Sequence, residues 1–148
     1  MRRFKFRLQH ILDMKEHLRK EVELRLGAAT AECNRLDMQL QALADQRLQT
    51  QRPVADRQAV LADLQYRAGH VAWIDQELQR LSHIRASAEK KRLQVLKEYQ
   101  KALQEERVLQ KLKERREKEY YLAAARHEER YVEDIVADRY IRNGGLDG

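Results

Sequence analysis

Histidines are the residues of this chain best suited to bind a metal or move a proton. The chain has five of them, and His10 and His17 stand seven residues apart, which places both on one face of a helix with Asp13 between them. Donors on one exposed stretch do not complete a zinc site, because such sites take four ligands in a closed arrangement. The sequence also lacks a glycine-rich phosphate loop, paired cysteines and a nucleophile elbow. We therefore expect no catalytic residue, no metal site, no cofactor and no enzyme activity.

The elements that carry these histidines are predicted to be long, polar helices. Charged residues make up 36% of the 148 residues and aromatic residues 6%, which suits paired helices better than a thick core. Disorder is the alternative, but charges of both signs are interspersed and leucines recur in phase. No stretch approaches the roughly 20 apolar residues of a membrane span, and charges from Asp13 onward interrupt the basic start, unlike a signal peptide. The single cysteine, Cys33, fits a reduced compartment.

An apolar seam with alternating steps of three and four residues runs along two stretches, which is the pattern of a coiled coil. The clearest parts are Leu26, Ala29, Cys33, Leu36, Leu40 and Leu43, and then Val71, Ile74, Leu78 and Leu81. The first seam is extended backwards through Val22, Leu18, Met14 or Lys15, Ile11 and Leu8, with an eleven-residue repeat between Leu18 and Ala29. The second passes through Ala88, Val95, Tyr99, Ala102 and Leu109, with Arg85, Arg92 and Glu106 as polar interruptions.

Breaks in the pattern divide a single coiled-coil domain, residues 1–148, into two helices. The first helix is predicted over residues 4–51, because Pro53 disfavours helical geometry before it. A connector is predicted over 52–70, with Asp56 capping a short helix and Gly69 as a second break. The second helix is predicted over 71–142, followed by a frayed tail at 143–148. Gly27 is either a tolerated interior glycine or a point of close backbone approach.

The predicted fold class is all-α, an antiparallel coiled-coil hairpin of these two helices. A bend near residue 61 places residue i opposite about 122 minus i, and the longer second helix extends past the N-terminus. A domain-swapped or parallel dimer is the alternative, since a seam does not specify which chain supplies its partner. The hairpin brings together two basic runs, within residues 1–10 and 85–118, beside a more acidic stretch at 119–148. Two basic runs at one end favour an acidic partner.

Both ends of the sequence resemble the FliJ family of flagellar type III export proteins. The resemblance rests on Phe4-Lys5-Phe6-Arg7-Leu8 with Ile11, Leu12 and Glu16, and on Glu106-Arg107-x-Leu109-x-Lys111-Leu112-Lys113-Glu114-Arg115-Arg116 with Tyr120, Glu128 and Glu129. It implies a non-enzymatic stalk in the pore of a hexameric flagellar export ATPase, linked to an FlhA-like export gate membrane protein and to export chaperones. It also implies a cytoplasmic location at the flagellar base, with membrane contact only through partners. The Asn-Gly-Gly ending departs from the family pattern.

Two surfaces follow as hypotheses from the residues and the resemblance together. The ATPase-binding residues are predicted to be Arg3, Lys5, Arg7, Lys111, Arg115 and Arg116. The gate-binding residues are predicted to be Trp73 and Ile84, which share a face beside the seam with Glu77, Arg80 and Ser87. The alternative for Trp73 is a small core under the folded connector.

Two other functions compete with export. A basic coiled coil that binds nucleic acid, or a basic scaffold, would account for the isoelectric point near 9.5. However, the net charge is only +6 and aromatic residues do not alternate with basic ones. A membrane-surface helix is disfavoured, because the narrow apolar stripe is used by the intramolecular pairing. We therefore expect no nucleic acid among the partners.

Overall fold

The computed structural model describes residues 2–52 and 61–144, and this part of the chain is helical almost throughout. It contains two helices, α1 (Gln9–Gln51) and α2 (Leu61–Gly144), which pack against each other as a hairpin. The all-α antiparallel prediction is confirmed. The chain divides into two compact units, one of residues 18–102 and the other of residues 2–17 with 103–144.

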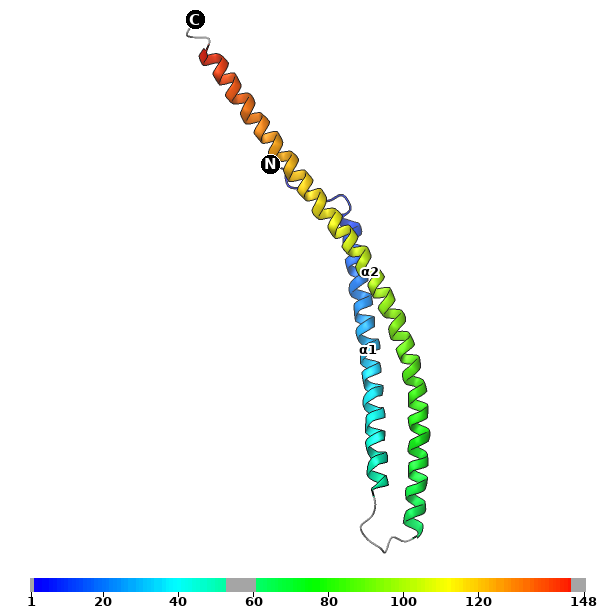
Figure 1. The fold of residues 1–148 in the computed structure, drawn as a ribbon. Helices are drawn as coiled ribbons and strands as arrows, with labels where there is room; N and C mark the ends of the chain where they lie inside the picture. The colour runs from blue at the N-terminus through cyan, green and yellow to red at the C-terminus, as the bar shows by residue number, and fades with distance from the viewer. Residues whose placement is uncertain (1, 53–60, 145–148) are drawn as a thin grey trace. The chain divides into compact units, whose positions relative to one another are not determined.

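The unit of residues 18–102 holds most of the core. Its two helical segments run side by side in opposite directions, cyan and green in Figure 1. Its fully buried side chains are apolar and come from both segments: Val22, Cys33, Leu36, Ile74, Leu81, Val95 and Ala102. Each seam position predicted between Leu26 and Leu43, and between Val71 and Leu81, is buried or half-buried, which confirms these two parts of the seam.

The seam of α1 keeps one unbroken heptad phase, which corrects the predicted early part. The buried or half-buried residues follow steps of four and three: Leu8, Leu12, Lys15, Arg19, Val22, Leu26, Ala29, Cys33, Leu36, Leu40, Leu43, Arg47 and Thr50. Leu12 is 4% exposed whereas Ile11 is 43% exposed, and Leu18 also faces solvent. Ile11 and Leu18 were therefore wrongly assigned to the seam, and no eleven-residue repeat occurs there. The stems of long charged side chains such as Arg19 cover apolar surface, so a search for apolar residues alone loses the phase.

Contacts between the two helices confirm the predicted register within each unit. In the unit 18–102, Arg47 Nε lies 2.6 Å from Asp75 Oδ1 and Arg85 Nε lies 2.7 Å from Asp37 Oδ1, pairs whose residue numbers add to 122. In the other unit, the Tyr120 hydroxyl donates to the Arg2 carbonyl at 2.6 Å, a pair with the same sum. The pair Lys15–Glu105 has a sum of 120, so the sequence pattern predicted the alignment of the helices to within about two residues.

The helix boundaries differ from the predicted ones at three of the four ends. α1 begins at Gln9 rather than near Phe4, and residues 2–6 have no regular structure. α2 begins at Leu61 and continues through Gly69 without a break, because a glycine inside a helix costs only about 1 kcal/mol relative to alanine. It ends at Gly144, two residues beyond the predicted end.

The interior glycines have no packing role in this fold. A Cβ atom added at Gly27 or at Gly69 would meet nothing within 4 Å, so neither glycine marks a close backbone approach. The predicted break at Pro53 and the predicted cap at Asp56 lie outside the described residues.

Candidate partner-binding surfaces

The unit of residues 2–17 and 103–144 carries the predicted ATPase-binding residues, and an aromatic contact fixes its N-terminal segment. The Phe4 ring lies 5.6 Å from the Tyr120 ring, centroid to centroid, and Tyr120 also donates its hydroxyl hydrogen bond to Arg2. Further along the same pair of segments, Lys15 Nζ lies 2.8 Å from Glu105 Oε2. The non-helical residues 2–6 therefore lie along α2 beside Tyr120 (Figure 1).

This arrangement places the two basic runs next to each other. All six predicted ATPase-binding side chains are exposed: Arg3, Lys5, Arg7, Lys111, Arg115 and Arg116. Arg115 and Arg116 both pair with Glu119, at 3.1 Å and 3.6 Å, and both remain largely open to solvent. Exposed pairs of this kind contribute about 0–1 kcal/mol, so a stronger acidic partner would displace them at little cost.

Two residues that sequence reasoning did not assign to this surface organise it. Phe4 and Tyr120 served only as family motif positions, yet their contact holds the basic N-terminal segment in place. Tyr121 packs edge-on against Tyr120 at 5.5 Å and lines a shallow hollow on α2. The other residues of that hollow are Glu114, Glu117, Lys118 and Leu122. The usable signal was Phe4 in the first basic run and Tyr120 just after the second, which the register places near each other.

Beyond this contact, α2 continues with every side chain from position 125 to 144 exposed. Several are large and apolar: Tyr131, Val132, Ile135, Val136, Tyr140 and Ile141. The predicted extension of the second helix past the N-terminal segment is thus present within this unit. A long helix with exposed apolar side chains offers contact area to a partner.

The predicted gate-binding residues lie in the other unit, on one stripe of α2. Trp73 is 52% exposed and Ile84 is 40% exposed. Trp73 stacks on His70, with centroids 5.9 Å apart, and His70 stacks on Tyr66 at 6.3 Å. Sequence reasoning missed Tyr66 and His70. His70 lies four residues after Tyr66 and three before Trp73, and this spacing places all three on the same stripe.

An ion pair within α2 separates the aromatic stack from Ile84. Arg80 Nε lies 3.1 Å from both carboxylate oxygens of Glu77, and this hydrogen bonding lowers the pKa of the Glu77 carboxyl. The stripe therefore presents aromatic, neutralised polar and aliphatic surface in succession. The alternative was a cover over Trp73 by connector residues 53–70. Residues 61–70 belong to α2 instead, and residues 53–60 lie outside the described part of the chain.

A charged cluster crosses the helix pair in the middle of the unit 18–102. Glu89 accepts hydrogen bonds from Arg92 at 2.6 Å and from Arg85 at 2.9 Å, and its carboxylate lies 3.8 Å from the buried Cys33 Sγ. Arg85 also binds Asp37 on α1. Hydrogen bonds from Arg92, which has the larger effect, and from Arg85 lower the pKa of the Glu89 carboxyl to about 2. The hydrogen bond to Asp37 is the main cause of the raised pKa of Arg85.

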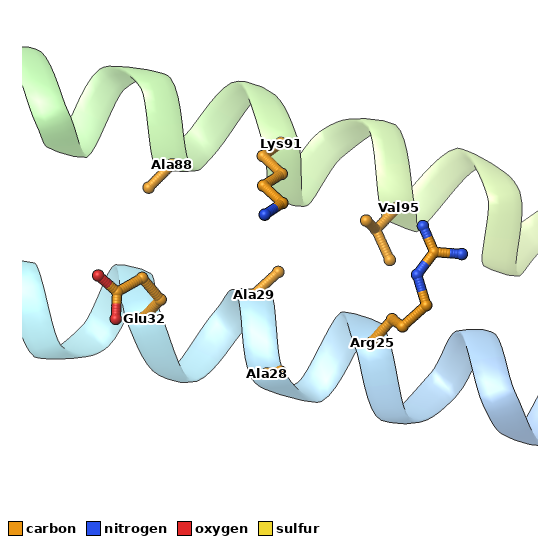
Figure 2. Close-up of a pocket in the computed structure, with 7 residues that line it drawn as sticks. All are labelled: Arg25, Ala28, Ala29, Glu32, Ala88, Lys91 and Val95. Atoms are coloured by element: carbon orange, nitrogen blue, oxygen red, sulfur yellow. The ribbon is translucent and has the colours of Figure 1, made fainter.

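A groove of about 290 Å³ lies beside this cluster, between the two helices. Figure 2 shows the small side chains of Ala29 and Ala88 pointing toward the facing helix, with Lys91 between Ala88 and Val95, and with Glu32 and Arg25 towards the two ends. Its full lining is Arg25, Ala28, Ala29, Glu32, Ala88, Lys91 and Val95. The groove forms where alanines replace the larger apolar residues of the seam.

The histidine pair does not form a metal centre in the described structure. His10 and His17 are both exposed, and within residues 2–52 and 61–144 no three histidine, cysteine or carboxylate side chains are grouped to hold a metal ion. Neither described helix contains a segment long and apolar enough to cross a membrane.

Comparison with known proteins identifies one family. The family model described as "Flagellar FliJ protein" matches residues 4–145, nearly the whole chain. No curated protein and no solved structure matches the sequence.

Proposed function

Because this chain belongs to the flagellar FliJ family and is thus a non-catalytic component of the flagellar export apparatus, we propose that it is the stalk of the hexameric export ATPase. In this role it links the ATPase ring to the export gate membrane protein and to substrate chaperones. It works in the cytoplasm, held at the membrane face of the flagellar base by its partners.

The convergence of two basic runs on one helical unit is the observation that carries the proposal. Residues 2–7 and 107–118 supply exposed cations from two segments, and α2 extends beyond them as a helix of mixed charge. A ring pore lined by acidic side chains would attract this unit at long range and orient it on entry. The exposed apolar side chains of positions 131–141 would then contact the ring wall.

The exposed stripe of the other unit supports the link to the gate. Tyr66, His70 and Trp73 form a stacked aromatic surface, and aromatic residues dominate the binding energy of many interfaces. The stripe lies in a different unit from the basic runs, so the two partners need not compete for the same residues.

Charge reversal on the basic runs tests the stalk assignment. The variant Arg3→Glu/Lys5→Glu/Arg115→Glu/Arg116→Glu is expected to lose binding to the purified ATPase, measured by pull-down at physiological salt. A matched control reverses four exposed lysines of the other unit, Lys90, Lys91, Lys97 and Lys101, and is expected to bind as the parent does.

Circular dichroism must show equal helicity for both variants. Undiminished binding by the first variant would refute the assignment. Equal loss in both variants would show that net charge alone, and no local surface, governs the interaction.

A further inference from the structure

The charged cluster around Cys33 has a composition that the stalk function does not explain. It joins two acids, Asp37 and Glu89, to two arginines, Arg85 and Arg92, so the cluster is neutral as a whole. Both arginines occupy seam positions of α2, where a coiled coil normally has apolar side chains. A charged seam position reduces stability and in return can specify one alignment of the helices.

Apolar packing is weakest where this cluster lies. Apart from Leu36, the apolar residues of the seam there are the small Ala29, Cys33 and Ala88, and the groove in Figure 2 replaces contacts that larger side chains would make. Small side chains bury little apolar area, so they discriminate weakly between alternative alignments. Larger buried residues of the seam lie on either side, Leu81 and Ile74 towards the bend and Val95 and Val22 away from it.

We propose that Asp37, Arg85, Glu89 and Arg92 form a register lock, which fixes the alignment of α1 against α2 in the middle of the hairpin. The heptad period makes a slip of seven residues the main alternative, because it returns seam positions to the interface. Such a slip displaces one helix by roughly 10 Å, at 1.5 Å per residue, and separates Asp37 from Arg85.

Both directions of slip break the cluster. In one direction Leu78 takes the place of Arg85 opposite Asp37, which leaves the carboxylate facing an apolar side chain. In the other direction Arg92 reaches that level, but Glu89 moves one heptad away from Cys33 and their contact across the helices is lost. The cluster therefore makes its full set of contacts in one alignment, whereas the apolar seam is nearly periodic.

The native Cys33 provides a direct reporter, since the chain contains one cysteine. In the observed alignment Ala88 lies opposite Cys33, so the single variant Ala88→Cys should form an intrachain disulfide under mild oxidation. A slip of one heptad would instead place Val95 or Leu81 there, and the variants Val95→Cys and Leu81→Cys report these two alignments. Non-reducing gels separate the intrachain product from dimers.

The substitutions Asp37→Ala/Glu89→Ala remove both acids of the register lock, and they are introduced into each of the three cysteine variants. We expect cross-linking through position 88 to slow by about 5- to 30-fold, the factor that corresponds to one or two kcal/mol. We also expect a product through position 95 or 81 that the parent lacks. The matched control Glu32→Ala/Glu77→Ala also removes two acids but keeps Asp37 and its ion pair with Arg85 across the helices, and it should behave as the parent does.

Cross-linking through position 88 at the control rate in the variant that lacks both acids, with no product at 95 or 81, would overturn the proposal. If the alanine variant loses its helical circular dichroism, the isosteric pair Asp37→Asn/Glu89→Gln replaces it under the same criteria. A slower reaction at position 88 that also occurs in the control would equally overturn it, because loss of any two acids would then suffice.

Discussion

The two units of this chain use the same helix α2 in different ways. In the unit of residues 18–102, α2 pairs with α1 through buried side chains and through ion pairs such as Arg47–Asp75 and Arg25–Glu98. In the unit of residues 2–17 and 103–144, most of α2 faces solvent, and the segment beside Tyr120 is not helical. The comparison teaches that helix formation and helix pairing are separate properties: the same kind of sequence continues as a helix after its partner has ended.

Truncation of buried and exposed apolar residues should separate the two units most strongly. Leu36 is 1% exposed, and Leu36→Ala is expected to lower the free energy of unfolding by about 2–5 kcal/mol through lost burial and a cavity. Val132→Ala in the extended part of α2 should change it by less than about 0.5 kcal/mol. Urea unfolding measures both. Equal effects would mean that positions beyond 125 have a partner in solution.

Removal of the Tyr120 side chain should affect the second unit locally. Tyr120→Ala eliminates the hydrogen bond to Arg2 and the packing against Phe4, each worth about 0.5–1.5 kcal/mol. We expect faster tryptic cleavage after Arg3, Lys5 and Arg7, with little change in the unfolding of the helix pair. Tyr131→Ala, which removes an exposed tyrosine, is the control and should leave cleavage unchanged. Unchanged cleavage in Tyr120→Ala would show that other contacts hold this segment.

The pH dependence of stability should reveal the charged cluster of the first unit. Arg92 and Arg85 lower the pKa of Glu89 to about 2 in the fold, from an ordinary value of 4.5. A carboxyl whose pKa is lowered by folding stabilises the fold above its ordinary pKa, and this contribution is lost as the pH falls from about 4.5 towards about 2. Glu89→Gln should therefore flatten the acid limb of the stability curve in that range.

The exposed Glu133→Gln serves as the comparison, and it should keep the acid limb of the parent. An unaltered curve for Glu89→Gln would show that the arginines do not favour the ionised carboxyl in solution.

Truncation of Trp73 should have a small effect on stability and a large effect on binding. Its side chain is half exposed and stacks on His70, so Trp73→Ala should shift the melting temperature by no more than a few degrees. Binding to the export gate protein should weaken, and Ile84→Ala should act in the same direction. A much larger fall in melting temperature would identify Trp73 as a core residue. Full gate binding by both variants would remove the stripe from the proposed interface.

Sequence reasoning found the antiparallel alignment because heptad spacing and the position of the bend together fix which residues meet. It failed at Ile11 and Leu18, which were preferred to the true seam residues Leu12 and Arg19, and it left the choice between Met14 and Lys15 open. Hydrophobicity marks a stripe, but the stems of long cationic side chains can occupy it as well. It also began the second helix too late in the sequence, at residue 71, because Gly69 was taken as a break. A glycine is only a weak helix breaker when the flanking residues favour helix.

The sequence by itself determined the two helices, their seam between Leu26 and Leu43, their register and the family, because periodicity and motif order are properties of the chain. The tertiary structure alone decided which charges act together. Cys33 and Asp37 are far in sequence from the segment Arg85–Arg92, and these residues become one cluster only when the helices pair. Likewise, the contact of Phe4 with Tyr120 that brings the basic runs together depends on side chains that meet across the fold. Local pattern governs helices through short-range hydrogen bonds and burial, whereas ion pairs and aromatic contacts across helices depend on atomic distances that only packing sets.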